Sequence, residues 1–131
     1  NIYTQWLSTA AVIYKKSKIK NIKFNSKFGA YAYLEDLDFS YKVSKRGMLM
    51  VLANSIYHTD NEVNRNQFMF GIKEINNRII FVKNNKLNTL RFIIGYFLLT
   101  IKNLSGIFYL NFGNFSRGIG NLVSCINLRK L

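Results

Sequence analysis

The sequence contains no proline, and its 131 residues include one cysteine, one histidine and only six acidic residues. Without proline, glycine and asparagine must form the turns. A single cysteine excludes an internal disulfide and a cysteine-based zinc site, and we expect Cys125 to be a small buried apolar residue. The chain starts at Asn1 instead of Met, so we expect it to be part of a longer polypeptide.

The scarcity of acidic residues leaves a strongly basic chain. Nineteen lysine and arginine residues give a formal net charge of +13. This charge favours an anionic partner, which could be nucleic acid, an anionic membrane surface or a phosphorylated substrate. Hydrophobic residues make up 49% of the chain and aromatic residues 15%, which excludes an intrinsically disordered protein.

The apolar pattern predicts both strands and helices. We expect a strand over about 10–14, then a basic connection with a short helix, because six lysines follow within 15–27. A helix is predicted over about 34–46, a strand over 48–53 and a helix over about 64–85. This order of elements is typical of an α/β domain.

Two apolar runs, 92–101 and 104–112, follow a polar break at 83–86. A membrane-spanning helix needs about 20 apolar residues, so these runs predict two short hydrophobic helices. Arg91 and Lys102 flank the first run, a pattern found in helices that lie on anionic lipid surfaces. The alternative is a helical hairpin that packs on its own domain.

Three of the six acidic residues fall within four positions, at Glu35, Asp36 and Asp38. They lie where a helix is predicted to begin, and acids there can cap free N–H groups and complement the helix dipole. A carboxylate in this apolar sequence context could also act as a base. The single histidine, His58, ends a short extended segment and is either a structural residue or a ligand for a divalent metal ion.

These residues together resemble a motif of a known enzyme family. The run Tyr33-Leu34-Glu35-Asp36-Leu37-Asp38-Phe39-Ser40-Tyr41-Lys42-Val43 precedes Lys45-Arg46-Gly47, an apolar strand and Tyr57-His58. This order is similar to the C-terminal acidic motif of family 2 inverting glycosyltransferases, in particular those of bacterial cell-surface polysaccharides. Shorter matches lie at 6–11, 24–28, 77–81 and 116–120. The chain departs from the family pattern at Asn25, at Thr9 and at Leu34, where glycine often precedes the acidic pair.

The resemblance implies an α/β fold, with residues 1–83 as the acceptor-side, C-terminal part of a Rossmann-like GT-A catalytic domain. Residues 84–131 would form a mainly helical, hydrophobic and basic extension that is peripheral to the membrane. The nucleotide-binding strands and the Asp-x-Asp motif would lie before Asn1, so we expect the chain by itself to be inactive.

The resemblance also implies roles for individual residues. Asp36 would be the general base and Glu35 would orient the acceptor, with Trp6 and Thr9 also contacting substrate. Asp38 would be structural, and His58 would help to hold Mn²⁺ or Mg²⁺. The donor would be a nucleotide-diphosphate sugar, and the acceptor a glycan or a lipid-linked glycan at the cytoplasmic face of the cell membrane.

Two non-enzymatic readings compete with this one. The charge would suit a basic module that binds nucleic acid, but the aromatic residues lie in apolar runs and are not interleaved with basic residues as stacking platforms. We therefore expect no nucleic-acid partner. A module or scaffold that binds an anionic membrane surface is the other alternative.

Overall fold

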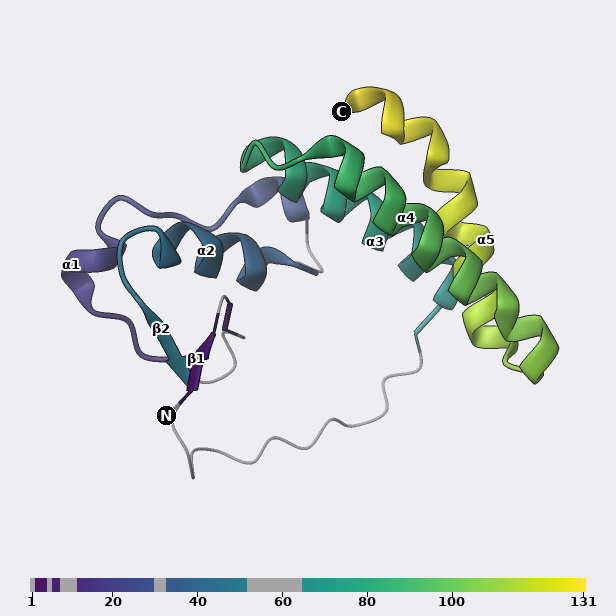
Figure 1. Ribbon diagram of the computed structural model, residues 1–131, viewed down its shortest axis with the longest axis horizontal. Coiled ribbons are helices and arrows are strands. Elements are labelled where there is room, and N and C mark those ends of the chain that lie inside the picture. The colour runs from purple at the N-terminus through teal and green to yellow at the C-terminus, as the bar shows by residue number, and fades with distance from the viewer. Residues whose placement is uncertain (1, 5, 8–11, 30–32, 52–64) are drawn as a thin grey trace. The chain divides into compact units, whose positions relative to one another are not determined.

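The computed structural model describes residues 2–4, 6–7, 12–29, 33–51 and 65–131, which belong to two compact units (Figure 1). The first unit is Asn1–Glu62 and the second is Val63–Leu131. The domain boundary predicted between 83 and 84 stays a prediction, and these two residues are the last of a helix, Gln67–Asn84.

A short two-stranded antiparallel ribbon pairs the first and last described segments of the first unit. β1 (Ile2–Thr4) pairs with β2 (Leu49–Val51), and α1 (Lys16–Ile19), η1 (Ser26–Phe28) and α2 (Glu35–Ser44) lie between them in the chain. The structure confirms the short helix in the basic connection, the helix over about 34–46 and the strand after it. The strand predicted at 10–14 is wrong for 12–14, which are not in a strand.

The core of the first unit forms where α2 meets β2. Phe39 and Val43, four residues apart on one face of α2, are buried with Leu49 of β2. Phe24 stacks on Phe39 with ring centroids 4.3 Å apart, and Tyr14 meets the same ring edge-on at 5.3 Å. This small aromatic cluster fixes the orientation of α2.

The second unit is helical throughout its described part. Its elements are α3 (Gln67–Asn84), α4 (Thr89–Leu104), η2 (Ser105–Tyr109), α5 (Phe112–Val123) and η3 (Ser124–Lys130). The predicted helix over about 64–85 and the first hydrophobic helix are confirmed. The prediction of a second hydrophobic helix over 104–112 is wrong, because that run forms the 3-10 turns of η2 and the beginning of α5.

Asparagine begins each long helix of the second unit. An asparagine side chain accepts a hydrogen bond from the backbone N–H three residues on, at 2.9–3.1 Å. The pairs are Asn66 with Met69, Asn88 with Arg91, and Asn111 with Asn114. Asparagine is among the best residues for this position, so a chain without proline still has defined helix starts.

Glycine allows α3 and α5 to pack backbone against backbone. A Cβ added at Gly71 would lie 2.2 Å from the carbonyl oxygen of Arg117, and one added at Gly120 would lie 2.2 Å from that of Phe68. No side chain fits at either distance. The two glycines therefore fix the closest approach of the two helices.

A buried carboxylate ties α3 to α5. Glu74 is 1% exposed, and its two oxygens accept hydrogen bonds from Arg117 Nε at 2.9 Å and Arg117 Nη2 at 2.8 Å. Arg78 Nη2 lies 3.2 Å from the same carboxylate. Because Glu74 is the only acidic residue of 63–131, this ion pair has no acidic substitute in the second unit.

Polar side chains also fill the interior between α4 and α5. The buried Asn121 amide, in the orientation that suits its neighbours, donates to the carbonyls of Gly71 and Arg117 and accepts from Asn103. Tyr96 donates to the backbone carbonyl of Asn121 at 3.0 Å. Burial raises the pKa of Tyr96 to about 12, with a smaller contribution from Cys125, so the hydroxyl stays protonated and remains a donor.

The predicted fold class is wrong. The described residues are 69% helical and contain a single two-stranded sheet, which is not an α/β, Rossmann-like GT-A fold. The physical reason is that the long apolar runs have helical spacing and asparagine caps, while the described strands are three residues each. Cys125, predicted to be buried, is exposed.

Candidate functional site

The acidic cluster occupies the first turn of α2, as the sequence predicted. The residue before it, Leu34, has a φ of 72°, in the left-handed region, and its carbonyl accepts a hydrogen bond from the N–H of Asp38 at 3.0 Å. This conformation costs a non-glycine residue about 1–2 kcal/mol. The chain therefore makes a strained turn directly before Glu35 and Asp36.

The three acids differ in their surroundings. Asp38 is completely buried, and its Oδ2 accepts a hydrogen bond from Lys42 Nζ at 2.5 Å, one turn along α2. Glu35 and Asp36 are half-buried residues, each with part of its surface exposed to solvent. The geometry gives Asp38 a structural position and leaves Glu35 and Asp36 as the pair that a substrate could contact.

Ser40 tethers the segment that carries Trp6 to α2. The backbone N–H of Leu7 donates to Ser40 Oγ at 3.1 Å, and Ser40 Oγ donates to the carbonyl of Leu7 at 2.8 Å. Residues four apart share a helix face, so this segment follows the face of α2 on which Asp36 lies. Trp6 itself is 52% exposed. Ser40 could not be recognised from the sequence, because its partner is 33 residues away.

The other predicted site residues, Thr9 and His58, lie outside the described residues. Within the described part, no group of three or more His, Cys, Asp or Glu side chains could hold a metal ion. Among the described residues, the candidates adjacent to Asp36 in the chain are Glu35 and Asp38, and Asp38 is already paired with Lys42. The described residues therefore do not fit a Mn²⁺ or Mg²⁺ ion, and the metal site stays a prediction that depends on His58.

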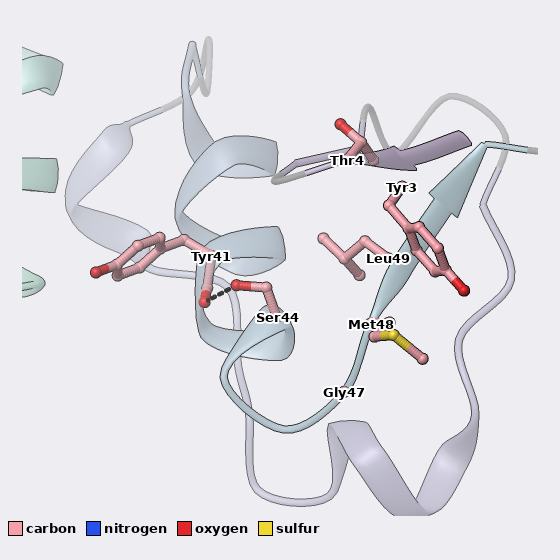
Figure 2. A pocket seen from close by; sticks show the side chains of 7 residues that line it. All are labelled: Tyr3, Thr4, Tyr41, Ser44, Gly47, Met48 and Leu49. Atoms are coloured by element: carbon pink, nitrogen blue, oxygen red, sulfur yellow. Dashed lines mark hydrogen bonds between the residues drawn. The ribbon is translucent and has the colours of Figure 1, made fainter.

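A cavity of about 720 Å³ lies beside the ribbon and the C-terminal half of α2 (Figure 2). Its lining residues are mostly apolar or aromatic: Tyr3, Thr4, Tyr41, Ser44, Gly47, Met48 and Leu49. Ser44 Oγ donates to the carbonyl of Tyr41, so this hydroxyl is directed back to its own helix (Figure 2). Among the described residues, neither Trp6, Glu35 nor Asp36 lines the cavity, and none of the lining side chains is charged.

The second unit has a large exposed apolar face. On α4 this face consists of Leu90, Ile94, Phe97, Leu98 and Ile101, and after α4 it continues with Ile107, Phe108, Tyr109, Leu110 and Phe112. Phe108 is 84% exposed. Thr89–Tyr109 is long and apolar enough to cross a membrane, with a mean hydropathy of 1.4, and only 22% of it is buried. A core helix of a soluble protein would bury most of such a stretch.

No protein-family model, curated protein or solved structure matches the chain. The resemblance to family 2 glycosyltransferases therefore rests on the motif residues of 33–58 and on the shorter matches at 6–11, 24–28, 77–81 and 116–120. The function is argued below from these residues and their geometry.

Proposed function

We propose that this chain is the acceptor-side part of an inverting glycosyltransferase in which Asp36 is the general base. One observation carries the proposal. The left-handed residue Leu34 directly precedes two partly exposed acidic residues, Glu35 and Asp36, at the start of α2, on the helix that also holds the Trp6 segment.

The conformation of Leu34 supports the resemblance independently of the acidic residues. The family often has glycine immediately before the acidic pair, and position 34 has the backbone conformation that glycine adopts at low cost. Strained residues of this kind persist where the surrounding structure requires them, and they cluster at functional sites.

In the proposed reaction, Asp36 takes the proton of an acceptor hydroxyl while that oxygen attacks the anomeric carbon of a nucleotide-diphosphate sugar. The new C–O bond forms as the bond to the diphosphate breaks, and the nucleoside diphosphate leaves with the bonding electrons. Glu35 orients the acceptor. Trp6 offers a partly exposed indole, a suitable surface for the apolar face of a sugar ring.

The test is glycosyl transfer by the full-length natural protein, measured as nucleoside diphosphate release with a panel of nucleotide-sugars and glycan acceptors. We expect Asp36→Asn to reduce turnover by about 10²-fold or more while donor affinity hardly changes, because a base contacts the acceptor. Asp38→Asn is the matched control in the same turn, and we expect it to act on stability. If both variants lower the melting temperature and neither changes turnover per folded molecule, Asp36 is not the base.

We further propose that residues 63–131 hold the protein on an anionic membrane surface. The observation is the exposed apolar face together with the charge of this unit, which has ten basic residues and one acidic residue. Apolar side chains enter the interface of the bilayer, and the basic residues are attracted to anionic headgroups. This arrangement favours a membrane over nucleic acid, because the exposed aromatic rings lie among aliphatic side chains.

Liposome sedimentation tests this second proposal. We expect binding to vesicles that contain phosphatidylglycerol, weaker binding to phosphatidylcholine alone, and loss of binding in Phe97→Ser/Phe108→Ser. Met48→Ser, at an exposed apolar residue of the first unit, is the control and should bind as the unsubstituted chain does. Binding that depends on charge but not on Phe97 and Phe108, and that duplex DNA competes away, would favour the nucleic-acid module instead.

A further inference from the structure

A second cavity, of about 280 Å³, lies between α3 and α4 within the second unit. α3 contributes Arg78, and α4 contributes the remaining lining residues, Arg91, Phe92, Gly95, Tyr96 and Leu99. Two guanidinium groups thus share one cavity with apolar and aromatic walls. A cavity of this kind suits a ligand with an anionic head and an apolar body.

The positive charge of the cavity is only partly neutralised. Arg117 makes two hydrogen bonds to Glu74, at 2.8 and 2.9 Å, whereas Arg78 makes one, at 3.2 Å. Arg78 Nε is buried and makes no hydrogen bond to the part of the chain that the structure describes. No other acidic residue exists in 63–131. The single negative charge of Glu74 therefore faces the guanidinium groups of Arg78 and Arg117, while Arg91 adds a further positive charge to the cavity lining.

Gly95 keeps the wall of this cavity open. It lies in the middle of α4, where glycine costs about 1 kcal/mol relative to alanine. Gly71 and Gly120 are needed for helix contact, but a Cβ added at Gly95 would meet no atom within 4 Å. Packing therefore does not explain this glycine, whereas close approach of a ligand to the backbone of α4 would.

The cavity continues onto the exposed apolar face. At about 100° per residue around a helix, Leu98 lies about 60° and Ile94 about 100° from Gly95, both on the same side. Both side chains are exposed. An apolar chain that leaves the cavity over Gly95 would therefore reach Leu98 and then Ile94.

We propose that this cavity binds the phosphate head of an anionic lipid, with the lipid chain over Gly95 and along Leu98. Arg78 and Arg91 donate to the phosphate oxygens, as arginine does in charge-assisted pairs. Phe92, Tyr96 and Leu99 contact the first carbons of the chain. The volume is just below the usual range for small-molecule pockets, about 300–1,000 Å³, and suits a headgroup but not a whole lipid.

The site is tested with the whole chain, Asn1–Leu131, and dihexanoyl phosphatidic acid below its micelle concentration, by calorimetry or ligand-observed NMR. A soluble lipid separates this inference from the proposed membrane binding, which needs a bilayer. Inorganic phosphate and dihexanoyl phosphatidylcholine are the comparison ligands. We expect phosphatidic acid to bind at least tenfold more tightly than either, because only phosphatidic acid combines an apolar chain with an unshielded phosphate.

Three variants locate the binding. We expect Arg91→Gln to weaken phosphatidic acid binding about tenfold or more, while Arg129→Gln, which removes the same charge from an exposed position in η3, leaves it within twofold. Gly95→Leu should abolish binding by filling the cavity without loss of helix, which circular dichroism checks. Gly95→Ala, the matched control, should keep most of it.

Each other outcome overturns the proposal. Equal affinity for inorganic phosphate would mean a free-phosphate site in place of a lipid site. Equal loss in Arg91→Gln and Arg129→Gln would mean attraction to the overall charge. Unchanged binding in Gly95→Leu would mean that the lipid binds elsewhere.

Discussion

In the first unit, an aromatic and aliphatic cluster around Phe39, Val43 and Leu49 forms the centre of the interior, and Asp38 and Ser40 of the same helix are buried as well. In the second unit, the helices meet over glycines and over buried polar groups such as Glu74 and Asn121, while α4 exposes Phe97, Leu98 and other large apolar residues. Small residues and hydrogen-bonded polar groups between helices are typical of helices packed in an apolar environment. The way in which the helices of the second unit pack supports the proposal that this unit lies at a lipid interface.

The largest expected effect concerns the polar interior of the second unit. Glu74→Gln should lower the free energy of unfolding by about 2–4 kcal/mol, because it removes the buried negative charge that pairs with Arg117, whose side chain is 24% exposed. Urea unfolding of the whole chain, followed by circular dichroism at helical wavelengths, measures the change. Arg129→Gln is the surface control, for which we expect less than about 0.5 kcal/mol. A loss below about 1 kcal/mol for Glu74→Gln would break the comparison, since the polar interior would then not hold the helices together.

Replacement of glycine by alanine should have opposite effects on stability at a helix contact and at the proposed lipid cavity. Gly120→Ala should destabilise by about 1–3 kcal/mol, because its Cβ would meet the Phe68 carbonyl and force α3 and α5 apart. Gly95→Ala should instead stabilise by about 1 kcal/mol, since helix propensity improves and nothing is in the way. Thermal unfolding of both variants gives the two signs directly. Destabilisation by Gly95→Ala would mean that the fold itself requires glycine at position 95, without any ligand.

The elements that the sequence predicted well are those whose signals are local. The three- and four-residue spacing of apolar residues predicted the helices now seen as α2 and α3, and the cluster of acids predicted the start of α2. The apolar run at 92–101 also lies within α4. These predictions depend on residues within a few turns of one another, for which periodicity is the primary signal.

The predictions that failed depended on contacts between distant residues. The α/β fold class assumed that short apolar runs would pair into a larger sheet, but among the described residues only β1 and β2 pair, with Ile2 opposite Val51, 49 residues along the chain. The tether from Ser40 to Leu7 and the pairing of Glu74 with Arg117 span 33 and 43 residues. No local pattern marks such partners.

The smallest expected effect compares two strained leucines, one in each unit. Leu34 has a φ of 72° and Leu110 a φ of 54°, both in the left-handed region. Leu34→Gly should be about 1 kcal/mol more stable than Leu34→Ala, because both remove the side chain and only glycine relieves the strain. The same difference is expected between Leu110→Gly and Leu110→Ala. Differential scanning fluorimetry of the four variants in water measures both differences.

The two positions should differ in how the stability of the glycine variant compares with that of the unsubstituted chain. Leu34 is half-buried, so the lost packing offsets the relief of strain, and Leu34→Gly should lie close to the unsubstituted chain in stability. Leu110 is 78% exposed, so Leu110→Gly should be more stable than the unsubstituted chain in water. On vesicles we expect the order at 110 to reverse, because a leucine that costs stability in water contributes apolar contact with lipid. If the Leu110→Gly variant binds phosphatidylglycerol vesicles as well as the unsubstituted chain does, this end of η2 faces water. The apolar surface at the interface would then be limited to α4.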